Sequence, residues 1–255
     1  MKFPKNIFMP FVVLGDPTYE QSVKLIKALI DNGAGALELG FAFSDPVADG
    51  PVIQKANKRA LEQGISTAKA FELLKQIRLY SQIPISLMLS FNIVYQYGIE
   101  EFYKKCKELK IDAVLCPDAP LEESEDLVKF AKKYSISQVF IISQTTTEER
   151  MKKINKIASG YVYLVSLLGT TGAREMLNQK LPDMIKRVKK AINLPVYVGF
   201  GISKPEHVKE VISFGADGAI CGSAICRLIE VNLNDYSKMC VEIARFCKEM
   251  SSEIL

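Results

Sequence analysis

Residues 194–224, LPVYVGFGISKPEHVKEVISFGADGAICGSA, hold a complete strand–helix–strand unit. The apolar runs Val196–Gly199 and Gly218–Cys221 suit short buried strands, and Pro205–Phe214 between them has helical periodicity. Ser203 is a candidate N-cap ahead of a proline and an acidic first turn, which is a typical helix start. The unit therefore predicts two strands joined by a helix.

The same alternation of short apolar runs and amphipathic helical segments continues along the whole chain. We expect eight strands, near Phe8–Val13, Ala36–Leu39, Ile85–Leu89, Ala113–Cys116, Gln138–Ile142, Tyr161–Val165, Val196–Gly199 and Gly218–Cys221. We expect helices near Tyr19–Asn32, Lys69–Ser81, Ile99–Lys110, Glu122–Tyr134, Glu148–Ala158, Pro182–Ala191, Pro205–Phe214 and Asp235–Ser251.

The strands read as apolar runs without alternation, which is typical of parallel strands covered on both faces. Eight such units favour closure into an α/β (β/α)8 barrel of the TIM type over an open doubly wound sheet. No GxGxxG motif follows the first strand, so a Rossmann fold is a weak alternative. We therefore predict a single barrel domain over residues 1–255.

The composition is that of an ordinary globular protein, with 48% hydrophobic and 24% charged residues. The net charge of +4 comes from 33 basic and 29 acidic residues spread along the chain, so we expect no nucleic-acid partner. The first apolar run, Ile7–Leu14, is too short to span a membrane, and no signal-peptide cleavage pattern follows it.

Six cysteines occur without any CxxC pair, and two of them lie inside apolar strand-like runs. This pattern favours buried, reduced thiols in the cytoplasm over disulfides or zinc. The one histidine, His207, falls beside the apolar stripe of its helix, so we expect it at the surface. Histidine-dependent catalysis and a metal site are therefore not expected, and carboxylates must carry the chemistry.

Glycine-rich loops follow the last three predicted strands, at Gly169–Gly172, Gly199–Ser203 and Gly222–Ala224. Glycine lets backbone N–H groups approach an anion closely, and a short helix starting at Gly222 would point its positive end at the same place. Together the loops predict a phosphate site, which recurs at this position of the fold. The alternative is that these glycines only turn the chain.

Glu38 lies between two leucines in the second predicted strand. A buried carboxylate is costly to ionise, so its pKa should rise toward the range where it both gives and takes a proton. We expect Glu38 to be an acid/base group; the alternative is a structural glutamate with hydrogen bonds in the core.

The long loop Phe41–Pro51 contains two prolines and the aspartates Asp45 and Asp49. Loops of this length in a compact domain tend to be functional, and prolines stiffen them. One of the two aspartates is a candidate second catalytic carboxylate, although a solvated surface loop would have the same composition.

The segment Leu37–Gln54 resembles the characteristic strand and loop of the tryptophan synthase alpha subunit family. Further matches cover essentially the whole chain and lie at Pro10–Pro17, Asp118–Ser124, Thr171–Ala173, Gly199–Ile202 and Gly222–Ala224. The resemblance implies cleavage of indole-3-glycerol phosphate into indole and glyceraldehyde 3-phosphate. It implies that Glu38 protonates the indole ring carbon, that Asp49 holds the indole N–H, and that Thr171 hydrogen-bonds this aspartate.

The resemblance also implies where the substrate and the partner bind. It places the substrate phosphate and the indole ring against two sets of residues: Gly172, Gly201, Gly222 and Ser223 for the phosphate, and Phe11, Tyr163 and Phe200 for the ring. Family members usually work with a tryptophan synthase beta subunit in an α2β2 heterotetramer. That partner, which Asp45 and Asp118 would face, carries pyridoxal phosphate, so this chain is expected to need no cofactor.

Three departures from the family pattern lead to further expectations. Ala42 stands where a proline is usual, and Leu167-Leu168, which lie outside the residues that the structure describes, stand where the family is often more polar. Both changes are expected to alter loop closure or subunit signalling. A short segment precedes the first strand where the family commonly has a helix that plugs the barrel, which is expected to lower stability. Three alternatives stay open: a catalytically weak allosteric partner of the beta subunit, a standalone lyase, and another phosphate-binding barrel such as indole-glycerol-phosphate synthase or phosphoribosylanthranilate isomerase.

Overall fold

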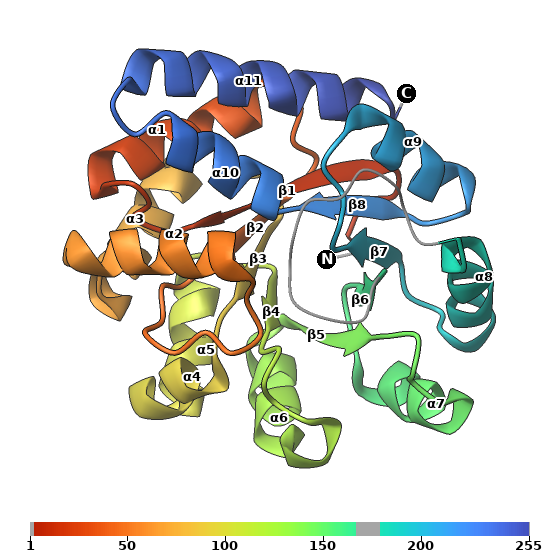
Figure 1. Cartoon of the computed structure of the whole chain (residues 1–255). Coiled ribbons are helices and arrows are strands. Elements are labelled where there is room, and N and C mark those ends of the chain that lie inside the picture. The colour runs from red at the N-terminus through yellow and green to blue at the C-terminus, as the bar shows by residue number, and fades with distance from the viewer. Residues whose placement is uncertain (1–2, 167–178, 255) are drawn as a thin grey trace.

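The structure is a computed structural model that describes residues 3–166 and 179–254. In this part of the chain eight parallel strands pair in sequence order and close into a barrel, β1 to β8 and back to β1 (Figure 1). The strands are β1 Ile7–Val13, β2 Leu37–Gly40, β3 Ile85–Met88, β4 Ala113–Leu115, β5 Ser137–Ile142, β6 Val162–Val165, β7 Val196–Gly199 and β8 Gly218–Cys221. The predicted barrel and its eight strands are confirmed.

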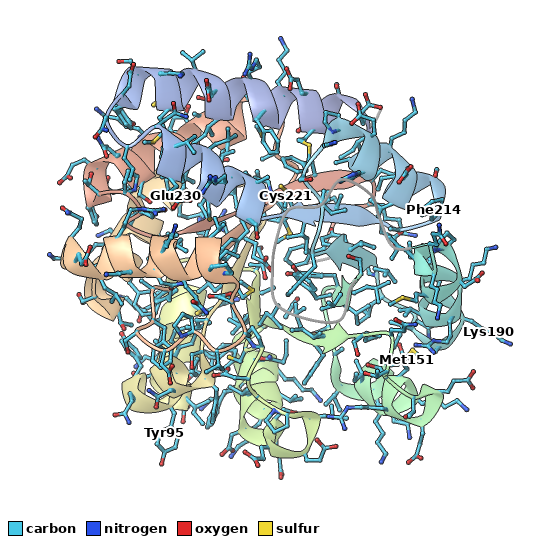
Figure 2. All side chains as sticks on the ribbon, viewed as in Figure 1. Tyr95, Met151, Lys190, Phe214, Cys221 and Glu230 are labelled. Carbon is cyan, nitrogen blue, oxygen red and sulfur yellow. The ribbon has the colours of Figure 1, made fainter. Side chains whose placement is uncertain are left out.

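Helices surround the strands as a ring, as Figure 1 shows. They are α1 Tyr19–Asp31, α2 Pro51–Glu62, α3 Thr67–Tyr80, α4 Phe91–Tyr97, α5 Ile99–Glu108, α6 Glu125–Tyr134, α7 Glu148–Ile157, α8 Leu181–Ala191, α9 Pro205–Ser213, α10 Ser223–Val231 and α11 Tyr236–Ser252, with the 3-10 turn η1 Leu121–Glu123. Side chains such as Tyr95 and Lys190 project outward from this ring, whereas Cys221 lies inside it at β8 (Figure 2).

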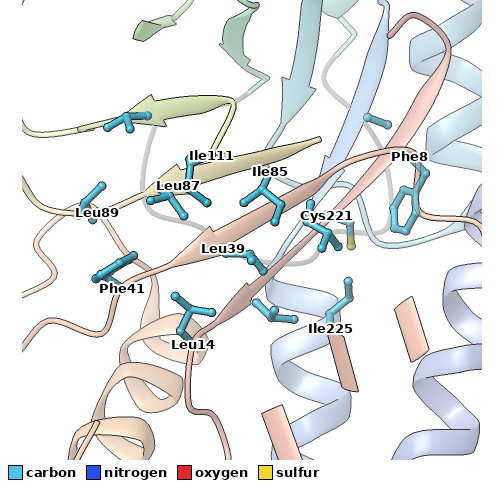
Figure 3. Packing of buried hydrophobic residues seen from close by; sticks show 14 of the residues in the cluster. Phe8, Leu14, Leu39, Phe41, Ile85, Leu87, Leu89, Ile111, Cys221 and Ile225 are labelled. Atoms are coloured by element: carbon cyan, nitrogen blue, oxygen red, sulfur yellow. The ribbon is translucent and has the colours of Figure 1, made fainter. Parts of the chain in front are cut away.

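Two core layers result from the alternation of side chains along each strand. Leu37 and Leu39 of β2 belong to the outer layer, which packs strands against the surrounding helices; Figure 3 shows Leu39 among its neighbours in this layer. The barrel interior holds a second cluster, which includes Met9, Leu115 and Tyr197. Glu38 therefore points inward because its two leucine neighbours belong to the outer layer.

Two helices were not predicted, α2 and α4, and α10 is longer than the short helix expected there. Helix α2 begins at Pro51, a favoured first helical position. Only one of its buried residues is a large apolar side chain, so its apolar stripe is faint: Ile53, Ala56, Asn57 and Ala60. Helix α4 has only seven residues, too few to show a period.

Phe3 closes the end of the barrel where the strands begin. Its ring lies 4.9 Å from that of Tyr161 and 6.2 Å from that of Tyr197, and the two tyrosines stack at 4.5 Å. The Tyr197 hydroxyl donates to the Pro4 carbonyl at 2.5 Å. One aromatic side chain thus occupies the barrel bottom.

The six cysteines, all within the described ranges, are free thiols, and five of them are buried. This agrees with the expectation of buried thiols rather than disulfides. Helices long and apolar enough to cross a membrane are not found among the described residues.

Candidate functional site

A cavity opens at the carboxyl ends of the strands, among the loops that follow β2, β7 and β8. It is lined by both predicted catalytic residues and by six of the eight predicted binding residues: Glu38, Asp49, Phe11, Tyr163, Phe200, Gly201, Gly222 and Ser223. The other two, Thr171 and Gly172, lie outside the described residues. The structure therefore brings the described candidates together in one place.

Glu38 lies in the barrel wall with 1% of its surface exposed. The pKa of this carboxyl is raised from 4.5 to about 8, mainly by burial; a hydrogen bond from the Tyr161 hydroxyl opposes the rise and the Asp49 charge adds to it. The Tyr161 hydroxyl lies 3.4 Å from Glu38 Oε1 and 2.9 Å from Ser86 Oγ. Glu38 is therefore protonated near neutral pH and able to donate a proton into the cavity.

Asp49 lies near the end of the β2–α2 loop. Burial raises its pKa from 3.8 to about 6, and a hydrogen bond from Asn57 opposes this rise. Between pH 6 and 8 Glu38 is then mostly neutral and Asp49 mostly ionised. Two carboxyl groups whose environments separate their pKa values in this way suit one acid and one acceptor role.

Aromatic rings form part of the cavity wall. Tyr163 and Phe200 meet edge to face, with ring centroids 6.1 Å apart. A Cβ atom at Gly199 would overlap the Tyr163 hydroxyl, and one at Gly222 would lie 2.9 Å from Cδ1 of Phe11. These glycines therefore make room for the rings, a packing reason that the sequence alone did not reveal.

The described glycine loops also bring backbone toward the cavity. Phe200 and Gly201 have φ angles of +72° and +81°, a left-handed turn that glycine favours at the second position. Helix α10 begins at Ser223, directly after Gly222, and presents its N-terminus beside the cavity. Ser166, which the sequence did not single out, supports this turn because its hydroxyl donates to the Phe200 carbonyl.

The prediction that His207 lies at the surface is wrong. Only 4% of it is exposed, and its Nδ1 accepts a hydrogen bond from the Ser203 N–H at 3.3 Å. The imidazole folds back over the β7–α9 turn, a tertiary contact that helical periodicity could not predict. In residues 3–166 and 179–254 no group of three or more His, Cys, Asp or Glu side chains is arranged to hold a metal ion.

Asp45 and Asp118 line a second cavity that borders the first and shares Phe11 and Asp49 with it. The Asp118 carboxylate accepts hydrogen bonds from Ser90 Oγ at 2.6 Å and from the Phe91 N–H at 2.8 Å. It therefore stabilises the start of α4, in addition to facing this opening. The partner-facing role of both aspartates remains a prediction.

A closed (β/α)8 barrel with one buried and one partly buried carboxyl group in a cavity at its strand ends is the architecture of an enzyme that acts on a small molecule by acid–base chemistry. Over residues 1–254 the sequence matches the family model described as tryptophan synthase alpha chain. The chain therefore belongs to the tryptophan synthase alpha chain family.

Individual relatives agree with this assignment. The tryptophan synthase alpha chain of Methanothermobacter thermautotrophicus is 47% identical over 91% of this chain and 86% of its own length. That of Photobacterium profundum is 46% identical over 97% of this chain and 93% of its own. A solved chain from the tryptophan synthase α2β2 complex of Pyrococcus furiosus superposes with a TM-score of 0.91, at 36% identity, covering 98% of this chain and 99% of the other.

Proposed function

We propose that this chain cleaves indole-3-glycerol phosphate into indole and glyceraldehyde 3-phosphate, with Glu38 and Asp49 as its catalytic residues. The observation that carries the proposal is that both carboxyl groups line one cavity while burial gives them different pKa values. Membership of the tryptophan synthase alpha chain family supports the choice of substrate.

The reaction needs a proton at the indole ring carbon, because that carbon is a poor leaving group until it is protonated. Glu38 donates this proton, and Asp49 accepts a hydrogen bond from the ring N–H and stabilises the positive charge that develops there. The carbon–carbon bond then breaks as the adjacent hydroxyl gives its proton to the Glu38 carboxylate and becomes the aldehyde. The electron pair of the broken carbon–carbon bond returns to the ring and restores the aromatic indole. The ring carbon gains one proton from Glu38, and Glu38 regains one from the substrate hydroxyl.

The remaining cavity residues bind and orient the substrate. Backbone at Gly201 and Gly222 and the Ser223 residue at the start of α10 hold the phosphate, where the positive end of the helix favours an anion. Phe11, Tyr163 and Phe200 pack against the indole ring. Thr171 and Gly172, which lie outside the described residues, complete the sets that the family resemblance implies.

The proposed partner is a tryptophan synthase beta subunit, in an α2β2 heterotetramer like that of the Pyrococcus furiosus relative. Asp45 and Asp118 face it from the second cavity, through which indole passes. We propose that pyridoxal phosphate belongs to that subunit alone, that this chain works without a cofactor, and that the complex acts in the cytoplasm.

The test is release of glyceraldehyde 3-phosphate from indole-3-glycerol phosphate by the purified chain, with and without a beta subunit. We expect turnover that rises with the partner and falls by roughly 100-fold or more in Glu38→Gln and Asp49→Asn, since each variant removes a proton-transfer or charge-stabilising group. Glu249→Gln and Asp31→Asn, which change exposed carboxylates on α11 and α1, are matched controls and should leave turnover unchanged.

Two other results would assign a different function. A wild-type chain with no turnover in either condition, but which still stimulates the beta subunit, would be an allosteric partner only. Full turnover that a beta subunit neither binds nor changes would indicate a standalone lyase.

A further inference from the structure

We infer that Asn57 of α2 is a positioning residue that sets the orientation of the Asp49 carboxylate and holds both ends of the β2–α2 loop. The inference rests on the proposed function, because it assigns Asn57 to the same acid–base site. Asn57 lines the second cavity but not the one that holds Glu38, so its effect on that site passes through Asp49.

Three hydrogen bonds involve both polar atoms of the Asn57 side chain, and this residue is 3% exposed. Its Oδ1 accepts from the Phe43 N–H at 3.0 Å, and its Nδ2 donates to Asp49 Oδ2 at 3.2 Å and to the Ile53 carbonyl at 2.9 Å. A flipped amide would put its NH2 group against the Phe43 N–H and its oxygen against two other oxygens, so only one orientation is favourable.

The helix that carries Asn57 is itself anchored on the barrel. Two residues further along, Arg59 makes a bidentate ion pair with the buried Asp16 carboxylate, at 2.8 Å for both contacts. Ile53, on the same buried face of α2, packs in the cluster that contains Phe11 of β1. Because α2 is fixed in this way, the Asn57 amide holds the β2–α2 loop in one position relative to the barrel.

In this geometry the two carboxylate oxygens of Asp49 have different partners. The Asn57 amide occupies Oδ2, which leaves Oδ1 to accept the indole N–H. The bond to the Phe43 N–H fixes the start of the loop, six residues before Asp49. A carboxylate held at one oxygen keeps the other in one direction, and preorganisation of this kind is what charge stabilisation requires.

The first experiment compares steady-state turnover of Asn57→Ala and Asn57→Asp with that of two controls in the complex with the beta subunit. Gln54→Ala removes a bond from the same helix to the Asp49 main-chain carbonyl, at 2.8 Å, without touching the carboxylate. Asn232→Ala removes an amide that bridges the Leu228 carbonyl and a Glu242 carboxylate in the same manner, away from the site.

We expect kcat to fall roughly 100-fold in both Asn57 variants with little change in KM, the size of effect that loss of a catalytic geometry produces. Asn57→Asp keeps an acceptor for Phe43 but cannot donate to Asp49. If it retained wild-type kcat, or if Gln54→Ala or Asn232→Ala lost as much as Asn57→Ala, the positioning role would be refuted.

A second readout does not depend on substrate. Removing the amide donor raises the pKa of Asp49, so its carbon-13 NMR titration should move to higher pH in Asn57→Ala and stay in place in Gln54→Ala. The other titratable groups coupled to this carboxylate are Glu38 of β2, Tyr163 of β6 and Cys226 of α10.

The two readouts separate the two hypotheses. An inactive wild type with the expected NMR shift would refute the proposed function and leave the placement of Asn57 intact. An active wild type with neither the NMR shift nor a loss of kcat in Asn57→Ala would refute the inference alone.

Discussion

Burial of Glu38 raises the pKa of its carboxyl group, and this shift also makes the stability of the fold depend on pH. The unfolded chain exposes this carboxyl, whose pKa is then near 4.5, whereas the folded barrel raises the pKa to about 8. Because the folded pKa is the higher one, protonation favours the folded state. The resulting stabilisation is complete below about pH 4.5 and is lost as the pH rises through about 8. The proton that the reaction needs is thus held at a cost in stability at alkaline pH.

The corresponding prediction concerns Glu38→Gln. Glutamine has a similar shape and no charge, so the variant should gain stability over the wild type as the pH rises, by on the order of 3 to 5 kcal/mol between pH 5 and pH 9. Urea unfolding followed by circular dichroism at a series of pH values measures this difference. Glu249→Gln, at a carboxylate with 55% exposure, is the control and should show no such trend. A constant difference between Glu38→Gln and wild type would contradict the pKa shift.

The sequence predicted Glu38 because two flanking leucines already place it in a buried strand. It could not predict Asn57 or His207. Asn57 acts on residues 8 and 14 positions away in the chain, and only the folded loop brings them within hydrogen-bond distance. His207 is buried by the turn that folds over it, not by the stripe of its own helix. The signal available for Asn57 was a polar residue on the buried face of α2, a helix that was itself missed.

Helix α2 connects the β2–α2 loop to the barrel wall. It carries Asn57 toward Asp49 and Arg59 toward Asp16, and Asp16 follows β1 with 1% of its surface exposed. A buried ion pair adds little net stability when both partners are present, but removal of one partner leaves the other charge without compensation. The Arg59–Asp16 pair is therefore a contact that anchors α2 to the barrel and whose loss should be costly.

Arg59→Met should destabilise the protein by about 3 to 5 kcal/mol, because Asp16 would stay buried without its cation. The double variant Asp16→Asn/Arg59→Met should recover most of this loss. Chemical unfolding of the single and double variants forms a double-mutant cycle that measures the coupling.

Lys58→Met, one position away on α2, is the matched control for that cycle. Lys58 pairs with Glu62 at 3.8 Å, and both side chains are largely exposed, so its loss should change stability by no more than about 0.5 kcal/mol. If Arg59→Met were as mild as Lys58→Met, the ion pair could not be what anchors α2.

The strands were predictable as elements because each is an apolar run between turns, and the observed ends differ from the predicted ones by about a residue. Helix α2 was not, since small residues such as Ala56 and Ala60 allow it to pack closely against the barrel without a strong apolar stripe. The long loop ahead of it was recognised correctly. Its conformation could not be, because it depends on contacts with that unrecognised helix.

At the scale of the whole molecule, two similar hydrogen bonds from backbone N–H groups to aspartate side chains join neighbouring strands at the end of the barrel opposite the cavity. Asp112, just before β4, accepts the N–H of Ile85 at 2.8 Å, and Asp217, just before β8, accepts that of Val196 at 2.9 Å. Each aspartate thus joins its own strand to the start of the preceding one. Phe3 closes the space inside this end of the barrel, and we propose that the chain unfolds as a single domain.

The last prediction tests how this end of the barrel is sealed. Phe3→Ala should destabilise the protein by about 3 to 5 kcal/mol, the usual cost of removing a buried phenylalanine, because it leaves a cavity beneath Tyr161 and Tyr197. Unfolding in urea should remain a single transition that coincides when followed by circular dichroism and by tyrosine fluorescence, which no tryptophan obscures in this chain.

Tyr95→Ala, at a tyrosine with 63% exposure on α4, is the control for the loss of an aromatic ring and should change stability by about 0.5 kcal/mol or less. A Phe3→Ala variant as stable as this control would mean that the barrel bottom does not depend on the ring. Two separate transitions in the wild type would contradict the single domain. If Phe3→Ala instead lost several kcal/mol of stability and still unfolded in one transition, Phe3 would stabilise the whole barrel. A contact whose loss destabilises every strand together is part of the cooperative unit that the strands share.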